Sequence, residues 1–186
     1  MSLNERKKYL RAEVKRELNL LKDRQQQSEE IVKNVEILLQ ELSPKVLGLF
    51  LPMPDEVAID SLLNRAGCTK ALPRWVDDKL SDGQMDFYSY ESEEDLEKQQ
   101  MFGKEILQVK ETRIVTPDVL LVPGLAFSKQ RERLGRGKGF YDRYIEKNNK
   151  ITTIGICFRE QLKNNLPLGD HDRLLDILIT PDEVYR

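Results

Sequence analysis

Three basic side chains alternate with three glycines between residues 133 and 139. Glycine has no Cβ, so backbone N–H groups at these positions can turn toward a ligand and approach it closely. Arginine and lysine add charge-assisted hydrogen-bond donors, which suit the oxygens of a phosphate. The spacing therefore indicates a loop that binds a polyphosphate. Its members are Arg133, Gly135, Arg136, Gly137, Lys138 and Gly139.

This loop differs from two common glycine motifs that bind nucleotides. No Lys-Ser or Lys-Thr pair follows the last glycine, so the loop is not a P-loop. Phe140 and Tyr141 follow Gly139, so it is not the dinucleotide motif G-x-G-x-x-G either. The residues alone leave a second interpretation open, a solvated basic turn without a ligand.

The segments around the loop predict how it is positioned. The apolar run at 119–122 is short and branched, which predicts a buried strand just before the loop. Phe140, Tyr141, Tyr144 and Ile145 recur at helical spacing, which predicts a helix from residue 140 to about 147. The glycines would then precede a helix N-terminus, whose unpaired N–H groups and dipole favour an anion.

The rest of the chain alternates predicted helices with apolar strands. Ser2 and Glu5 form a capping box, so a helix is expected to begin there. The other predicted helices cover 28–42, 56–66 with Asp55 as N-cap, and 95–101, and the other predicted strands cover 46–51, 69–72, 85–90, 153–158 and 176–180. This order predicts an α/β fold in three layers, with a mostly parallel sheet, helices on both faces and an N-terminal helical pair. We expect residues 1–186 to form a single domain.

Ligands of such sheets bind beyond the carboxyl ends of the strands. Leu51, Val122 and the residues after Phe158 each follow or end a predicted parallel strand. We therefore expect them to border one crevice.

The composition and net charge indicate which class of protein and which kind of ligand to expect. Hydrophobic residues make up 39% and charged residues 33%, which is typical of a soluble globular protein. The net charge of −2 gives no strong global field for nucleic acid, so the basic loop favours a small anionic ligand. Cys68 and Cys157 are interpreted as reduced core thiols, and the chain shows no apolar signal-peptide core or membrane-length run. These features predict a cytoplasmic protein with no membrane partner.

The residues around the loop also resemble the signature of a known family. Residues 123–127 read PGLAF, residues 133–135 read RLG and residues 137–142 read GKGFYD. In this order they resemble the 5-formyltetrahydrofolate cyclo-ligases, also called methenyltetrahydrofolate synthetases. The resemblance implies a three-layer α/β enzyme that converts 5-formyltetrahydrofolate and ATP to 5,10-methenyltetrahydrofolate, ADP and phosphate.

The resemblance implies an ATP site on the loop and on the N-terminal helix. Lys7 and Arg11 match an N-terminal Lys-x-x-x-Arg motif and share a helix face, although a solvated charged face is the alternative. Lys138 and Arg136 are the expected catalytic residues, which would neutralise the transferring phosphoryl group. The full set of expected ATP contacts is Lys7, Arg11, Arg133, Leu134, Gly135, Arg136, Gly137, Lys138, Gly139, Phe140 and Tyr141.

The resemblance likewise implies folate and metal contacts. A carboxylate such as Glu56 can accept two hydrogen bonds from a pterin, although a helix-dipole partner is the alternative. Trp75 could stack on a flat ring or belong to the core. The implied folate contacts are Leu51, Glu56, Trp75, Arg136, Gly137, Lys138, Gly139 and Phe140. Asp142 and Asp172 are the implied Mg²⁺ carboxylates, with a first-turn helix acid or a partner for Arg143 as the alternative for Asp142.

Three positions depart from the family pattern. Ser128 stands where an aspartate is common, Arg131 where a glycine is common, and Phe140 replaces the first of two tyrosines. The departures at Ser128 and Arg131 leave open a non-catalytic folate- or nucleotide-binding protein. An RNA-binding module that uses the basic loop is a third alternative, but the acidic balance and the lack of an aromatic-basic face argue against it. The expected partner is a small folate rather than nucleic acid, and we expect a monomer rather than an oligomer.

Overall fold

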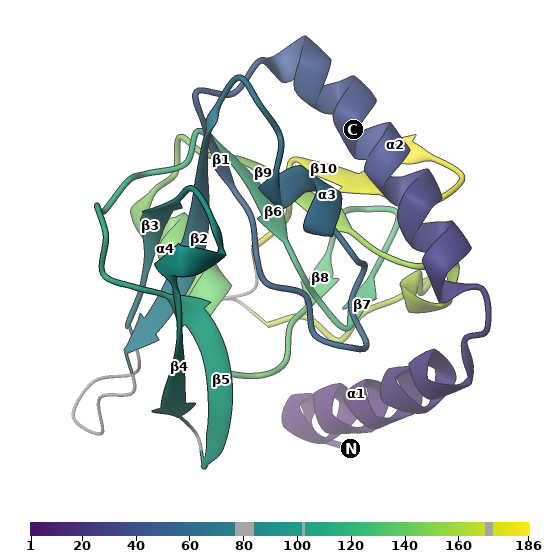
Figure 1. The fold of residues 1–186 in the computed structure, drawn as a ribbon. Coiled ribbons are helices and arrows are strands. Elements are labelled where there is room, and N and C mark those ends of the chain that lie inside the picture. The colour runs from purple at the N-terminus through teal and green to yellow at the C-terminus, as the bar shows by residue number, and fades with distance from the viewer. Residues whose placement is uncertain (77–83, 102, 170–172) are drawn as a thin grey trace.

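A computed structural model of the chain describes residues 1–76, 84–101, 103–169 and 173–186. Within these residues, seven strands form the central sheet in the order β11-β10-β9-β6-β1-β2-β3 (Figure 1). The strands are β1 Val46–Gly48, β2 Thr69–Val76, β3 Gln84–Tyr90, β6 Val119–Val122, β9 Thr152–Ile156, β10 Ile177–Ile179 and β11 Val184–Tyr185.

The inner strands of this sheet are parallel and both edge strands are antiparallel. β10, β9, β6, β1 and β2 pair in parallel, whereas β3 pairs antiparallel with β2 and β11 pairs antiparallel with β10. The carboxyl ends of the parallel strands thus share one edge. The predicted mostly parallel α/β sheet is confirmed.

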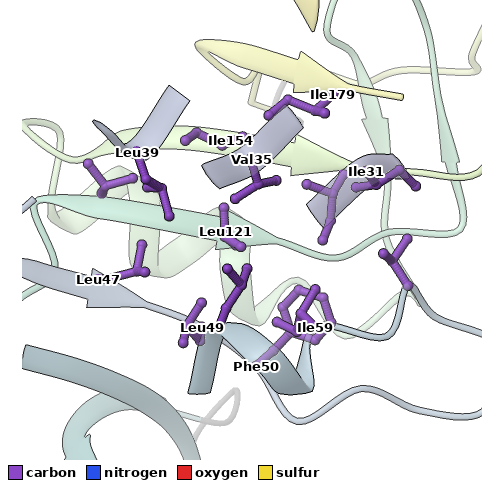
Figure 2. Close-up of a cluster of buried hydrophobic side chains, with 14 of the residues drawn as sticks. Ile31, Val35, Leu39, Leu47, Leu49, Phe50, Ile59, Leu121, Ile154 and Ile179 are labelled. Atoms are coloured by element: carbon purple, nitrogen blue, oxygen red, sulfur yellow. The ribbon is translucent and has the colours of Figure 1, made fainter. Parts of the chain in front are cut away.

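Helices cover both faces, as predicted. One face packs against α1 (Leu3–Leu20) and α2 (Arg24–Leu42), the predicted N-terminal pair, and against α3 (Asp60–Leu63). Figure 2 shows Ile31, Val35 and Leu39 of α2 lying over Leu121 and Ile154 of the sheet. The other face packs against Tyr144 of α4 (Phe140–Lys147) in a second cluster with Leu120 and Val122. Because neighbouring residues of β6 enter opposite clusters, an uninterrupted apolar run suits this strand.

The start of α1 forms the predicted capping box. The backbone N–H of Ser2 donates to Glu5 Oε2 at 2.6 Å, and the Glu5 N–H donates to Ser2 Oγ at 3.3 Å. These two bonds satisfy donors that the first helical turn would otherwise leave unpaired.

The helix predicted over 56–66 is wrong. Only Asp60–Leu63 is helical, and the residues between β1 and α3 form turns and extended chain. Two contacts hold this segment outside a helix: the Glu56 N–H donates to Met53 O at 2.9 Å, and the Ala58 N–H donates to Ser28 Oγ of α2 at 3.2 Å. Asp55 therefore does not cap a helix.

The helix predicted over 95–101 is also wrong. Leu96–Met101 is strand β4, and it pairs antiparallel with β5 (Lys104–Val109) in a separate two-stranded ribbon. Glutamate, lysine and glutamine favour helices only weakly, so pairing with β5 overrides that preference. Buried Arg74 of β2 ties the ribbon to the sheet, because its guanidinium donates to Glu97 Oε1 and to Val109 O, each at 2.7 Å.

Two further details differ from the prediction. β2 continues through Pro73, which is tolerated because β1 pairs only with Thr69–Ala71 and the pairing with β1 ends before Pro73. A short hairpin of β7 (Ala126–Phe127) and β8 (Arg133–Leu134) was not predicted. In the described part of the chain, no helix is long and apolar enough to cross a membrane. Cys157 is buried, Cys68 is half-buried, and neither forms a disulfide.

Candidate active site

The glycine loop lies at the carboxyl edge of the sheet, between β8 and α4. Arg133 and Leu134 belong to β8 and are buried, so the part of the loop outside the strand begins at Gly135. Gly137 has φ +104° and Gly139, the N-cap of α4, has φ +67°. Side chains with a Cβ rarely adopt such angles, so glycine is required for this path into the helix.

Arg133 is buried and binds residues that precede and follow the glycine loop. Its Nη1 donates to Pro123 O at 3.1 Å, and its Nη2 donates to Asp142 Oδ1 at 2.8 Å. The guanidinium carbon lies 5.8 Å from the centre of the Tyr141 ring. These contacts join the end of β6 to the first turn of α4, and they occupy the arginine inside the fold. Its expected contact with ATP remains a prediction.

Arg136 joins the loop to the segment that follows β1. Its Nη2 donates to Asp55 Oδ1 at 2.6 Å and to Glu56 Oε1 at 3.0 Å, and its Nε donates to the same Glu56 oxygen at 3.1 Å. The Arg136 and Asp55 side chains are 28% and 22% exposed, and Glu56 only 7%, so solvent screens this group weakly. The structure thus pairs an expected phosphate contact, Arg136, with an expected folate contact, Glu56.

The charges in this group stabilise one another. Burial alone would lower the pKa of Arg136, but its bonds and attraction to Asp55 and Glu56 outweigh burial and raise it. Burial alone would likewise raise the pKa of Asp55, but the Arg136 guanidinium holds it below its ordinary value. Both side chains are therefore charged at neutral pH.

The N-terminal helix reaches the same loop. Arg11 of α1 donates from Nε to Gly135 O at 2.9 Å, and its guanidinium carbon would lie 3.4 Å from a Cβ built on Gly137. Lys7 lies one helical turn before Arg11, on the same side of α1. Arg11 and the glycine loop, two parts of the expected ATP site, are therefore neighbours in space.

The remaining loop residues differ in exposure. Lys138 is exposed at the tip of the loop, and Phe140 packs partly against the α4 core cluster. The hydroxyl of Tyr141 is buried without a hydrogen-bond partner among the described residues. Burial, with a smaller contribution from Glu56, raises the pKa of this hydroxyl well above its ordinary value.

The segments beyond three parallel strands meet at this edge of the sheet, as predicted. Arg136 links residues after β6 to residues after β1. The Gln161 side chain, after β9, donates to Gly124 O at 2.8 Å and to Leu125 O at 3.2 Å. Leu51 is half-buried against the α1–α2 core, and half-buried Trp75 packs against the opposite cluster. Among the described residues, neither Leu51 nor Trp75 forms a hydrogen bond with the loop.

Asp142, the first expected magnesium carboxylate, lies beside the glycine loop. It lies in the first turn of α4, directly after the loop, and its side chain is 22% exposed. Asp172, the second expected carboxylate, lies outside the described residues. Within the described residues, no three His, Cys, Asp or Glu side chains gather around a possible metal position. Mg²⁺ at nucleotide sites commonly takes only one or two protein carboxylates, with phosphate and water completing its shell.

The sequence profile of the 5-formyltetrahydrofolate cyclo-ligase family matches residues 3–181. The chain belongs to this family. 5-Formyltetrahydrofolate cyclo-ligase of Mus musculus is 30% identical over 199 residues, which cover 98% of this chain and 97% of the mouse protein. 5-Formyltetrahydrofolate cyclo-ligase of Escherichia coli K12 is 31% identical over 149 residues, which cover 75% and 79% of the two chains.

Solved structures agree with this membership. The NMR structure of Aquifex aeolicus 5,10-methenyltetrahydrofolate synthetase has a TM-score of 0.79 at 28% identity, and covers 97% of this chain and 92% of its own. The Mycoplasma pneumoniae 5,10-methenyltetrahydrofolate synthetase has a TM-score of 0.72 at 22% identity, which supports the fold. The activity of the chain is accordingly that of a 5-formyltetrahydrofolate cyclo-ligase, an ATP-dependent ligase of folate one-carbon metabolism.

Sequence reasoning missed one charged residue beside the glycine loop. Asp55 was expected to cap a helix, but its carboxylate instead holds Arg136, 81 positions away. Charge could have indicated only that a partly desolvated arginine needs an acidic partner, and not that this partner is Asp55.

Proposed function

We propose that the cyclisation takes place at the edge of the sheet formed by the glycine loop, α1 and the segment after β1. ATP would bind the loop through Arg11, the backbone N–H groups of 135–139 and the N-terminus of α4. The folate would bind beside Glu56. The Arg136–Glu56 ion pair is the observation that carries this proposal, because it brings the expected ATP and folate contacts to hydrogen-bonding distance.

The chemistry converts a poor oxygen leaving group into a good one. The formyl oxygen on N5 attacks the γ-phosphorus, an O–P bond forms, and the bond to ADP breaks. N10 then attacks the activated formyl carbon, loses its proton, and the C–O bond breaks to release phosphate. This sequence forms the 5,10-methenyl bridge and balances one ATP against one ADP and one phosphate.

The protein contributes positioning and charge. Lys138 and Arg136 neutralise the transferring phosphoryl group, and the loop N–H groups hold its oxygens near the positive end of the α4 dipole. Glu56 accepts the N–H donors of the pterin. Holding the two substrates together replaces an encounter in solution with a reaction between aligned groups.

Asp142 would hold Mg²⁺, with Asp172 as the second carboxylate. Arg133 binds Oδ1 of Asp142, which fixes the orientation of this carboxylate next to the loop. When bound, Mg²⁺ would neutralise charge on the phosphates. We further expect residues 1–186 to act as a single cytoplasmic domain, as a monomer, on a free folate and not on nucleic acid.

Arg136→Gln tests this placement. Removing a charge that stabilises the transferring phosphate is expected to lower kcat by about tenfold to a thousandfold. Methenyltetrahydrofolate formation is followed by absorbance with purified protein, 5-formyltetrahydrofolate, ATP and Mg²⁺. Arg186→Gln is the matched control, because Arg186 binds only Glu41 in its described contacts, away from the loop. A folded Arg136→Gln enzyme with the control's kcat would contradict the proposal.

A further inference from the structure

Asp55 forms the shortest of the three contacts that Arg136 makes with carboxylate oxygens. Its Oδ1 lies 2.6 Å from Arg136 Nη2, against 3.0 and 3.1 Å for the bonds to Glu56. Neither the helix-capping interpretation nor the proposed site gives this residue a role. Its carboxylate lies at the edge of the site, more exposed than that of Glu56.

The acceptor capacity of Glu56 shows why Arg136 needs a second partner. A carboxylate offers about two acceptor positions on each oxygen. Arg136 uses both positions on Oε1, and the Met53 N–H uses one on Oε2 at 3.0 Å. A pterin that donates two parallel N–H bonds needs one position on each oxygen. Arg136 must therefore give up at least one bond to Glu56 when the folate binds.

We propose that Asp55 is a positioning residue that holds the Arg136 guanidinium in place while Glu56 exchanges Arg136 for the folate. This inference rests on the proposed function, since it takes Arg136 to serve the phosphate and Glu56 to serve the pterin. Arg136 turns about its bond to Asp55 and keeps Nη2 anchored. Its other N–H groups then face the phosphoryl group that is transferred.

Asp55 acts through Arg136, so the two residues are tested together in a double-mutant cycle. Asp55→Asn keeps the shape and removes the charge. We expect kcat to fall by about tenfold, which corresponds to the loss of one charge-assisted hydrogen bond. We also expect the folate KM to rise, because Arg136 without its Asp55 partner competes more strongly with the folate for the Glu56 carboxylate. In an Arg136→Gln background the same change is expected to alter kcat and the folate KM by less than about twofold.

The controls separate positioning from folding. Asp60→Asn is the matched control, because Asp60 is exposed at the start of α3 and carries the same carboxylate five positions away. Asp55→Ser provides a second variant, and thermal unfolding is measured for each. A folded Asp55→Asn or Asp55→Ser enzyme with the parent's kcat and folate KM would overturn the proposal.

The cycle also separates this inference from the proposed function. If Arg136→Gln leaves kcat unchanged, the placement of the phosphate at Arg136 fails, and the role of Asp55 fails with it. If Arg136→Gln lowers kcat but Asp55→Asn has an equal effect in both backgrounds, the placement stands and the role of Asp55 alone is overturned.

Discussion

Among single residues, Glu56 carries the proposed recognition of the folate. Glu56→Gln keeps the size of the side chain but replaces one strong acceptor with an amide donor. We expect the folate KM to rise by about tenfold or more, since a hydrogen bond to a charged group is worth about 1.5–3 kcal/mol. ATP binding, measured by calorimetry with a non-hydrolysable analogue, should survive. An unchanged folate KM would leave Glu56 only as a partner of Arg136.

Candidate functional residues could be predicted from the sequence where they belong to a local sequence motif. The alternation of glycine with basic residues from Arg133 to Gly139 indicates a phosphate loop before any fold is known. The contact of Asp55 with Arg136 has no local pattern, because it depends on how the ends of β1 and β6 meet. Its prediction would have required the sheet order.

At the scale of elements, the path of the loop depends on glycine at residue 137. Gly137→Ala places a Cβ at φ +104° and 3.4 Å from the guanidinium carbon of Arg11. We expect a loss of about 1–3 kcal/mol in the free energy of unfolding from backbone strain, and a higher KM for ATP because Arg11 and the loop N–H groups move.

The matched control for this change is Gly67→Ala. Gly67 also has positive φ, +85°, but a Cβ there would meet nothing within 4 Å. It should lower stability through strain and leave the KM for ATP unchanged. Equal effects of the two substitutions on the KM would show that strain alone, and not the loop geometry, affects ATP.

Elements with a strong pattern were predicted well, and elements decided by distant contacts were not. The run Val119–Val122 and the helix Phe140–Lys147 follow from apolar spacing alone. The composition of Leu96–Met101 favours a helix. These residues form a strand because they pair antiparallel with β5 and because Arg74 donates hydrogen bonds to both strands of the ribbon. Local preference is weak enough for such pairing to decide the outcome.

At the scale of the whole molecule, ion pairs join segments that are distant in the sequence. Glu41 of α2 binds Arg186 at the end of the chain, next to α2 in Figure 1, and Arg136 binds Asp55 across 81 positions. The Asp55 pair is the less exposed of the two, so it should contribute more to stability.

The lowered pKa of Asp55 predicts how the stability of the fold depends on pH. The pKa of Asp55 is lower in the folded than in the unfolded protein, whose value is about 3.9. Its contribution is therefore present above about pH 4 and is lost as the pH falls through the folded pKa. Urea unfolding of the parent and of Asp55→Asn should show the parent more stable at pH 7, with the difference shrinking as the pH falls through the folded pKa of Asp55, below its ordinary value. A difference that does not shrink with falling pH would show that the charge of Asp55 does not stabilise the fold.

The central claim is that Lys138 of the glycine loop stabilises the charge of the transferring phosphate, and Lys138→Ala tests it most directly. The measurement is kcat at saturating ATP and folate, so that weaker binding does not appear as slower chemistry. Lys150→Ala, a change at another exposed lysine, is the control, and thermal unfolding confirms that each variant folds. We predict a fall in kcat of about 10²–10³ for Lys138→Ala and no change for the control. A folded Lys138→Ala enzyme with near-normal kcat would contradict the claim and leave the stabilisation of the phosphoryl group to Arg136.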